Sequence, residues 1–439
     1  MSLQNYSFIE SHGFLMKRYL LLGSLFFLFQ FQGIAQTENL HLSFKNGTEK
    51  YKSIAVTWTS HKSCPGLIKY GLDSNKLTAK IKVQPKQVVG EKNLYAYKAE
   101  LKNLLPGKVY YYQCGSEDNN FIDDHQKDSW TAVHSFTTPP KFGAEGKYTI
   151  GIWGDTQDNQ GNKSFEKTAK IVSQLTKYPL DLTLHMGDIV ENGSVTASWN
   201  RFLQTAAPLN AKVPFMPVTG NHDVVNANDD PAFQQPFPVF HDLFDLPDDK
   251  LNYSFDYGNI HFIAINSGYC QGAAKFDKVL FQKGSPEYSW LENDLIKARK
   301  NKRTKWIIMY DHYPVHAYGV SLVPQWQDQI SPIIDKYKVD LVLSGHRHVY
   351  ERHKAIRNNI PLAQLDFHVY DKPAGTVYIT NGSAGGSLQG VGGSKMPSMV
   401  FTPTTRMHTY AIMTILGNQL IYDVYNEEAE KIDHFKLLK

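Results

Sequence analysis

The chain has 439 residues, of which 42% are hydrophobic and 20% are charged, and its formal net charge is +4. This length exceeds what one hydrophobic core supports, and the apolar content excludes a chain that is disordered throughout. The nearly neutral charge balance excludes an overall basic footprint for nucleic acid. We therefore expect a globular protein of at least two domains with no nucleic-acid partner.

The N-terminal stretch is typical of a secretory signal. Two basic residues, Lys17 and Arg18, precede an apolar run over 19–31, and small residues follow that run. The run is too short to cross a bilayer comfortably. We expect residues 1–35 to be a signal peptide region, with Met16 as an alternative initiator. The protein is then secreted or periplasmic, with no membrane segment in its mature form.

Residues 36–140 have the pattern of a small all-β domain. Short alternating runs are separated by turns rich in Gly, Asn, Asp and Pro, which predicts a β sandwich of the immunoglobulin or fibronectin III type. This part of the chain carries no catalytic constellation. The predicted strands lie at 53–58, 66–71, 95–101 and 109–112, and the Pro-rich stretch 138–143 marks the domain boundary.

Three cysteines are too few for a disulfide framework. If the segments 66–71 and 108–113 pair as antiparallel strands, Cys64 could face Cys114 across them, and an oxidising compartment would permit the bridge. The sequence leaves this disulfide and two free thiols equally open. Cys270 would then be left over as a buried thiol.

Residues 141–439 alternate between strand and helix patterns and return to β structure in the tail. A glycine-rich stretch over 382–393 is either a flexible linker or the rim of a pocket. Strands are predicted at 148–153, 180–186, 213–218, 306–310, 341–344, 376–380, 410–416 and 420–425, a hairpin at 253–266, and helices at 164–178, 198–206, 287–300 and 326–337.

Five polar turns each follow an apolar run, at spacings of 33, 33, 91 and 34 residues. Ligands collect at strand ends in open α/β folds, and carboxylate, amide and imidazole groups suit hard-to-borderline cations. Two cations about 3.5–4 Å apart can activate water and neutralise phosphate charge. We therefore predict a two-metal phosphoesterase centre with Asp188 bridging the ions. Its ligands are Asp155, Asp188, Asn221, His312, His346 and His348, and the last two, at i and i+2 of extended backbone, would project to one face.

The ordered motifs Gly154-Asp155, Gly187-Asp188, Gly220-Asn221-His222-Asp223, Asp311-His312 and Gly345-His346-Arg347-His348 resemble those of the calcineurin-like metallophosphoesterases. The stretch 345–352, GHRHVYER, resembles the last motif of the purple acid phosphatases, and the resemblance covers about residues 40–430. It implies an α+β two-domain fold. The N-terminal domain over 36–140 would be fibronectin III-like, and the catalytic domain over 141–439 would have four α/β/β/α layers.

The resemblance also implies roles for individual residues. One ion would be held by Asp155 and His348, the other by Asn221, His312 and His346, with Asp188 shared. A metal-bound hydroxide would attack the phosphorus. His222 would polarise the phosphate or protonate the leaving alkoxide, and His316 either shares that role or is a solvent-exposed loop histidine.

Two positions depart from the family pattern. Where the purple acid phosphatases place a tyrosine ligand, three residues after the bridging aspartate, this chain has Glu191. Where the wider superfamily often has a histidine, two residues after the first aspartate, it has Gln157. Glu191, Gln157 or water would fill the gap at the first ion. The metal pair is then iron, zinc or manganese in divalent or trivalent form, rather than a fixed iron(III) pair.

Three functions follow from this pattern. The preferred one is a secreted, acid phosphatase-like hydrolase of a phosphorylated small molecule, a phosphate monoester. A phosphodiesterase or nucleotide-hydrolysing enzyme is the second, because the same centre cleaves either ester. The third is a surface binding protein with an inactive hydrolase domain. The oligomeric state is not determined by the sequence.

The missing tyrosine predicts a colourless protein. A phenolate bound to iron(III) gives a strong visible charge-transfer band, and Glu191 cannot supply one. Protein whose metal content is verified by elemental analysis should show no strong absorption between the near ultraviolet and the red. A strong visible band in the metal-replete protein would contradict this prediction.

Overall fold

The computed structural model describes residues 37–45, 51–116, 130–159, 164–225, 237–267, 281–317, 324–389 and 397–439. The predicted signal peptide region and Cys270 lie outside these ranges. Among the helices in the described ranges, none combines the length and apolarity needed to cross a membrane.

The N-terminal domain consists of two four-stranded sheets, ordered β1-β2-β6-β5 and β4-β3-β7-β8. Their inner faces share one apolar core, in which the Trp58 ring stacks on Tyr97 at 5.2 Å between centroids. Alternation of buried and partly exposed residues along β6 shows the half-buried pattern expected of such a sheet. The strands are β1 (Glu38–Phe44), β2 (Ile54–Ser60), β3 (Gly66–Gly71), β4 (Ala79–Val83), β5 (Lys86–Gln87), β6 (Tyr95–Leu101), β7 (Val109–Gly115) and β8 (His134–Thr137).

The disulfide alternative between Cys64 and Cys114 is wrong in this structure, where both thiols are free and buried. The predicted antiparallel pairing of β3 with β7 is present, but its register places Cys114 opposite Ile68. Cys64 lies outside β3, four residues before Ile68, so it is not the residue that faces Cys114 across the pair. The strand register therefore keeps the two sulfur atoms apart.

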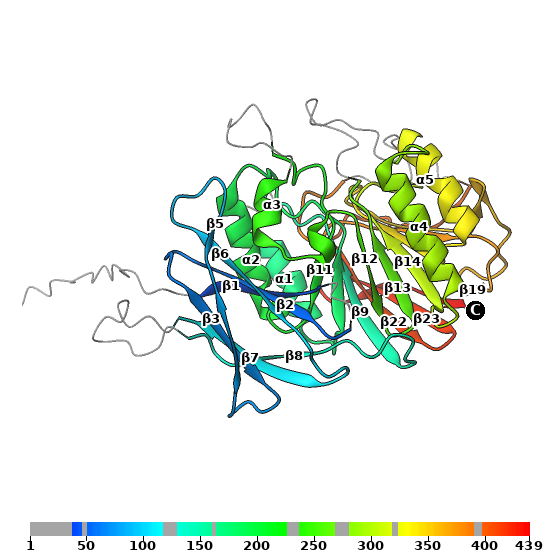
Figure 1. Ribbon diagram of the computed structural model, residues 1–439. Helices are drawn as coiled ribbons and strands as arrows, with labels where there is room; N and C mark the ends of the chain where they lie inside the picture. The colour runs from blue at the N-terminus through cyan, green and yellow to red at the C-terminus, as the bar shows by residue number, and fades with distance from the viewer. Residues whose placement is uncertain are drawn as a thin grey trace, which may run out of the picture.

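The C-terminal domain contains two mixed sheets (Figure 1), each of seven strands, and a small β17–β18 hairpin. The first sheet has the order β11 (Phe215–Pro217), β10 (Leu182–His185), β9 (Lys147–Trp153), β22 (Thr409–Leu416), β23 (Gln419–Asn426), β24 (Lys431–Leu438) and β19 (Val369–Asp371). The second has the order β12 (Tyr253–Tyr257), β13 (Ile260–Ala264), β14 (Trp306–Tyr310), β15 (Leu341–Ser344), β20 (Val377–Asn381), β16 (Tyr350–His353) and β21 (Met399–Phe401). The hairpin strands are β17 (Ile356–Arg357) and β18 (Ile360–Pro361).

Helices cover the outer faces of both sheets. The helices α1 (Glu166–Leu175) and α2 (Thr196–Asn210) pack on the first sheet, and α4 (Pro286–Lys300) and α5 (Pro324–Tyr337) on the second. Alternate residues of β14 take opposite sides: Ile307 and Met309 contact the α4 and α5 core, whereas Ile308 belongs to the core between the sheets. The predicted order, a β domain followed by an α/β domain, is confirmed.

Six strands of the second domain were not predicted: β16, β17, β18, β19, β21 and β24. The segments of β16, β19 and β24 contain charged residues that obscure the apolar pattern, although β24 alternates between buried and partly exposed positions. The charges are satisfied in three dimensions. Buried Arg352 donates to the Asp433 carboxylate from Nε at 2.6 Å and from Nη2 at 2.9 Å. This pair joins strands of the two sheets.

Strand direction brings the predicted ligands to one edge. Strands β13, β14, β15 and β20 run parallel, as do β9, β10 and β11. The carboxyl ends of each parallel set therefore lie together, and the polar turns after β9, β10, β14 and β15 follow those ends.

The N-terminal domain holds the C-terminal end of the short helix α3 (Pro238–Leu243), which follows the Asn221 turn in sequence. Lys98 Nζ donates to the carbonyls of His241 and Phe244 at 2.5 and 2.6 Å. His41 Nε2 lies 2.9 Å from the Leu243 carbonyl. These contacts satisfy carbonyl groups that a helix end leaves unpaired, and a cation is favourable at that end.

A buried histidine joins β12, β13 and α4. His261 Nδ1 lies 2.7 Å from Asp256 Oδ1, and Nε2 lies 2.8 Å from Asp294 Oδ2. Burial by itself lowers the pKa of His261, but its hydrogen bonds with the two carboxylates raise it to about 9. Because both ring nitrogens face carboxylates, the imidazolium is the form that this cluster stabilises.

This cluster predicts a pH-dependent stability difference between the wild type and His261→Gln. The folded pKa of about 9 is above the unfolded value of 6.5, so the histidine's contribution is complete below about pH 6.5. It is lost as the pH rises through about 9. Urea unfolding should show His261→Gln less stable by about 3 kcal/mol at pH 6 and by much less at pH 10. A difference that does not change with pH would contradict the charged histidine.

Candidate metal centre

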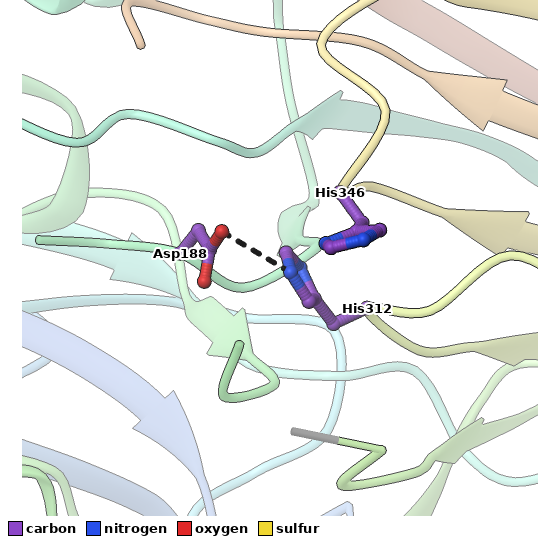
Figure 2. Close-up of side chains that lie close together, drawn as sticks. All are labelled: Asp188, His312 and His346. Atoms are coloured by element: carbon purple, nitrogen blue, oxygen red, sulfur yellow. Dashed lines mark ion pairs between the residues drawn. The ribbon is translucent and has the colours of Figure 1, made fainter. Parts of the chain in front are cut away.

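Two groups of side chains able to hold a metal ion lie at this edge, and both contain Asp188. One group is Asp155, Asp188 and His348, and the other is Asp188, His312 and His346. Within each group the candidate ligand atoms are within 4.8 Å of one another. Figure 2 shows Asp188, His312 and His346 directed toward one another from three separate turns, with His312 Nε2 3.2 Å from Asp188 Oδ2.

Four of these residues occupy left-handed backbone conformations. The φ angles of Asp155, Asp188, His346 and His348 are 51°, 51°, 68° and 36°. Such values are uncommon outside glycine and concentrate at functional sites. The prediction that the last two histidines lie on extended backbone is therefore wrong. The tight turn, rather than strand alternation, places His346 in one group and His348 in the other.

Backbone carbonyls fix two of the imidazole rings. The Nδ1 atom of His312 donates to the Met186 carbonyl at 2.8 Å, and that of His348 donates to the Ser387 carbonyl. This leaves both Nε2 atoms to face carboxylates, with His348 Nε2 3.6 Å from Asp155 Oδ1. A second hydrogen bond of this kind is how proteins set the tautomer and orientation of metal-binding histidines.

Asn221 lies beside the second group. Its Oδ1 atom is 3.1 Å from His312 Nε2 and 3.1 Å from His346 Nδ1. The amide oxygen thus lies close to both imidazole nitrogens. All six predicted ligand side chains are brought together in this way.

The electrostatics of the centre fit a cation. Burial raises the pKa of Asp155, and its Oδ2 atom is buried without a hydrogen-bond partner in the described part of the chain. Burial also acts to raise the pKa of Asp188, but His312 holds it well below the usual range. For His312, burial lowers the pKa and Asp188 raises it to about 9. Oxygen and imidazole donors that are buried and mutually close form a donor set suited to iron, zinc or manganese.

The two substitute ligands lie in different places. Gln157 is buried, and its Nε2 donates to Asp188 Oδ2 at 2.9 Å, so its amide contacts the shared carboxylate. The Glu191 carboxylate instead lies 3.6 Å from His222 Nδ1 and belongs to neither ligand group.

The two predicted catalytic histidines also differ in position. His222 is partly exposed, its backbone N–H donates to Asp188 Oδ1 at 2.9 Å, and its Nδ1 lies 3.0 Å from the Glu191 carbonyl. His316 is 4% exposed, which excludes the solvent-exposed alternative. Its Nδ1 accepts from Gln327 at 3.0 Å, and its ring packs edge-on against Tyr378.

Sequence reasoning missed residues that hold the ligand turns. The Asp223 carboxylate accepts hydrogen bonds from the backbone N–H groups of Ile189, Val190 and Gly220, at 2.8, 3.1 and 2.8 Å. It therefore ties the Asp188 turn to the Asn221 turn. The signal available in the sequence was the acidic residue that closes the Gly220–Asp223 motif.

The described part of the glycine-rich stretch forms a wall of the centre. The N–H of Gly386 donates to the Asp155 carbonyl at 2.8 Å, and Ser383 Oγ donates to the same carbonyl at 3.1 Å. A Cβ atom at Gly386 would lie 2.5 Å from Gln157 Oε1 and 2.9 Å from the Asp155 carbonyl oxygen. Only glycine leaves room for this close approach.

Comparison with known proteins agrees with the fold. Residues 148–350 match the family Calcineurin-like phosphoesterase, and residues 37–138 match Purple acid Phosphatase, N-terminal domain. The human Acid phosphatase type 7 is 27% identical over 80% of this chain and 78% of its own length. The Probable inactive purple acid phosphatase 27 of Arabidopsis thaliana is 24% identical over 70% of this chain and 52% of its own length.

Among solved structures, the purple acid phosphatase PPD1 from yellow lupin seeds superimposes with a TM-score of 0.76. The match covers 92% of this chain and 74% of that one at 20% identity, which establishes the fold. The layered domain and its cluster of carboxylate and imidazole ligands define a metallophosphoesterase, a hydrolase of phosphate esters. Within that class the chain combines a calcineurin-like phosphoesterase domain over residues 148–350 with a purple acid phosphatase N-terminal domain over residues 37–138.

Gly386→Ala should weaken metal binding. The added methyl group would push the loop away from the Asp155 carbonyl and from His348, whose Cε1 atom it would approach to 3.1 Å. Loss of such supporting contacts typically costs about tenfold or more in metal affinity. Competition titration with a chromogenic chelator would measure the change.

Gly66→Ala is the matched control, because its Cβ would meet Tyr97 at 2.7 Å in the N-terminal core. It should lower thermal stability without changing metal affinity. Equal metal affinity in wild type and Gly386→Ala would contradict the role of the loop.

Proposed function

We propose that this protein uses two metal ions to hydrolyse phosphate monoesters of small molecules, in the manner of an acid phosphatase. The observation that supports this most directly is that two candidate ligand groups share one carboxylate, Asp188. A shared carboxylate holds two cations close enough to act on one phosphate group. The signal-like pattern of residues 1–35 supports secretion or a periplasmic location.

In this proposal Asp155 and His348 hold one ion, and Asn221, His312 and His346 hold the other, with Asp188 shared. Bound ions supply an activated water and neutralise charge on the phosphate oxygens. Gln157 supports the shared carboxylate through the hydrogen bond from its Nε2 atom. Glu191 is not assigned as a ligand, because its carboxylate lies beside His222.

We assign the proton donor to His222. Its Nδ1–H donates to the Glu191 carbonyl, which fixes the ring and leaves Nε2 available to protonate the departing alkoxide. The backbone N–H of the same residue donates to Asp188, so the ring is attached directly to the centre. His316 receives a positioning role only, because it is buried against Tyr378 and accepts from Gln327.

A binding protein with an inactive hydrolase domain is the competing function, and one relative is named as probably inactive. The buried carboxylates of Asp155 and Asp188 speak against it. Burying a charge is costly unless it is paired or binds a cation. A site that no longer bound metal would therefore become more stable if these carboxylates were replaced.

The decisive experiment compares p-nitrophenyl phosphate with its bis ester on full-length, metal-loaded protein. We expect kcat/KM for the monoester to exceed that for the diester by more than about tenfold, and Asp188→Asn to lower it by more than about a hundredfold. The exposed Asp371→Asn provides a control of equal charge change.

A preference for the diester would replace the proposal with a phosphodiesterase. Undiminished activity of Asp188→Asn would refute the shared-carboxylate centre. If the metal-loaded wild type released no phosphate from any ester tried, the binding protein would take its place.

A further inference from the structure

A cavity of about 370 Å³ lies at the opposite edge of the second sheet from the metal centre. It is lined by Arg299 at the end of α4, by residues between 335 and 340 that lead into β15, by Arg357, by 372–376 before β20, and by 437–439. The metal ligands follow the carboxyl ends of the parallel strands, whereas these residues precede β15 and β20. The four residues of β15 alone separate the two places by roughly 13 Å.

The lining has five cationic and two anionic side chains. Both carboxylates are already engaged within the protein. Asp340 Oδ2 accepts from the backbone N–H of Ile307 and from Lys439 Nζ, each at 2.7 Å, and Asp335 Oδ2 accepts from the backbone N–H of Asn358 at 2.7 Å. The cavity is therefore a positively charged environment.

Three of the cations form no direct contact of this kind, although the charge of Arg357 acts to lower the pKa of the nearby Asp335 carboxyl. The side chains of Lys338, Arg357 and Lys372 are exposed and form no ion pair or hydrogen bond within the described ranges. They come from three different segments and surround one cavity. The backbone N–H groups of Ala374 and Gly375, also in the lining, donate to no acceptor in the parts of the chain that the structure describes.

An apolar surface completes the cavity. Val339 and Leu437 are buried at its wall, which lowers the local dielectric and strengthens the interaction of the cations with an anion. Unpaired lysines, an arginine fork and free backbone N–H groups are the donors that proteins use for phosphate groups. The volume exceeds that of a single phosphate.

We propose that this cavity binds a diphosphate group, inorganic or as part of a nucleotide, at a site separate from the metal centre. The two negative ends of a diphosphate can contact cations on different walls at once. Lys338, Arg357 and Lys372 bind the oxygens, and the Ala374–Gly375 turn adds neutral donors.

The test is isothermal titration calorimetry of full-length, metal-loaded protein with methylenediphosphonate, a diphosphate analogue whose bridging carbon resists hydrolysis. The wild type should bind two equivalents, one in the cavity and one at the metal centre. The triple variant Lys338→Gln, Arg357→Gln and Lys372→Gln should lose the cavity site, with at least tenfold weaker binding there, and should retain phosphatase activity. Asp188→Asn should retain the cavity site.

A control variant, Lys82→Gln, Lys108→Gln and Lys141→Gln, removes the same charge from exposed positions elsewhere and should bind like the wild type. If this control lost analogue binding as strongly as the cavity variant does, the loss would be an effect of net charge and the proposal would be overturned. The proposal would also be overturned if the cavity variant kept both binding sites. Equally tight cavity binding of inorganic monophosphate would refute the diphosphate assignment. A further outcome is a single site that the wild type and Asp188→Asn both show and the cavity variant lacks. This outcome would support the cavity site and would refute binding of the analogue at the metal centre.

Discussion

The concentration of negative charge in the interior is the constraint on which this structure depends. Asp155, Asp188 and Asp223 are all buried at the carboxyl edge of the sheets, and burial opposes ionisation of each. An unpaired buried carboxylate costs several kcal/mol. The surrounding turns respond by directing backbone N–H groups inward: His346 donates to Asp155, His222 to Asp188 and Gly220 to Asp223. The imidazole of His312 supplies further compensation to Asp188.

Such inward donation requires sharply turned backbone. Four of the predicted ligand residues have positive φ angles, and each such conformation is less favourable than ordinary strand or helix geometry by about 1 kcal/mol or more. The sheets hold them there. The ladder between β9 and β10 continues past the strand ends, because Asp155 and Thr156 donate to the carbonyls of Gly187 and Asp188. The turns with positive φ angles therefore continue the hydrogen-bonded ladder of the β9–β10 pair.

The two domains meet near the same region. Contacts from β1 and β6 to the end of α3 place the N-terminal domain against the segment that follows the Asn221 turn. Tyr112 extends the interface by donating to the Ala211 carbonyl at the end of α2. A domain with no ligand of its own thus stabilises the elements that flank the centre, which is a physical reason for the two to occur in one chain.

The sequence by itself determined the order of domains, most strands and helices, and the five side chains that gather around Asp188. These follow from local properties: apolar periodicity, turn residues at strand ends, and the chemistry of carboxylate and imidazole. It could not decide the left-handed turns, the separation of Cys64 from Cys114, the contact of Gln157 with the shared carboxylate, or the turn of Glu191 toward His222. The charged lining of the cavity was equally hidden, because it comes from five distant segments. Strand register and sheet order decide these features, and both arise from pairings between residues far apart in the chain.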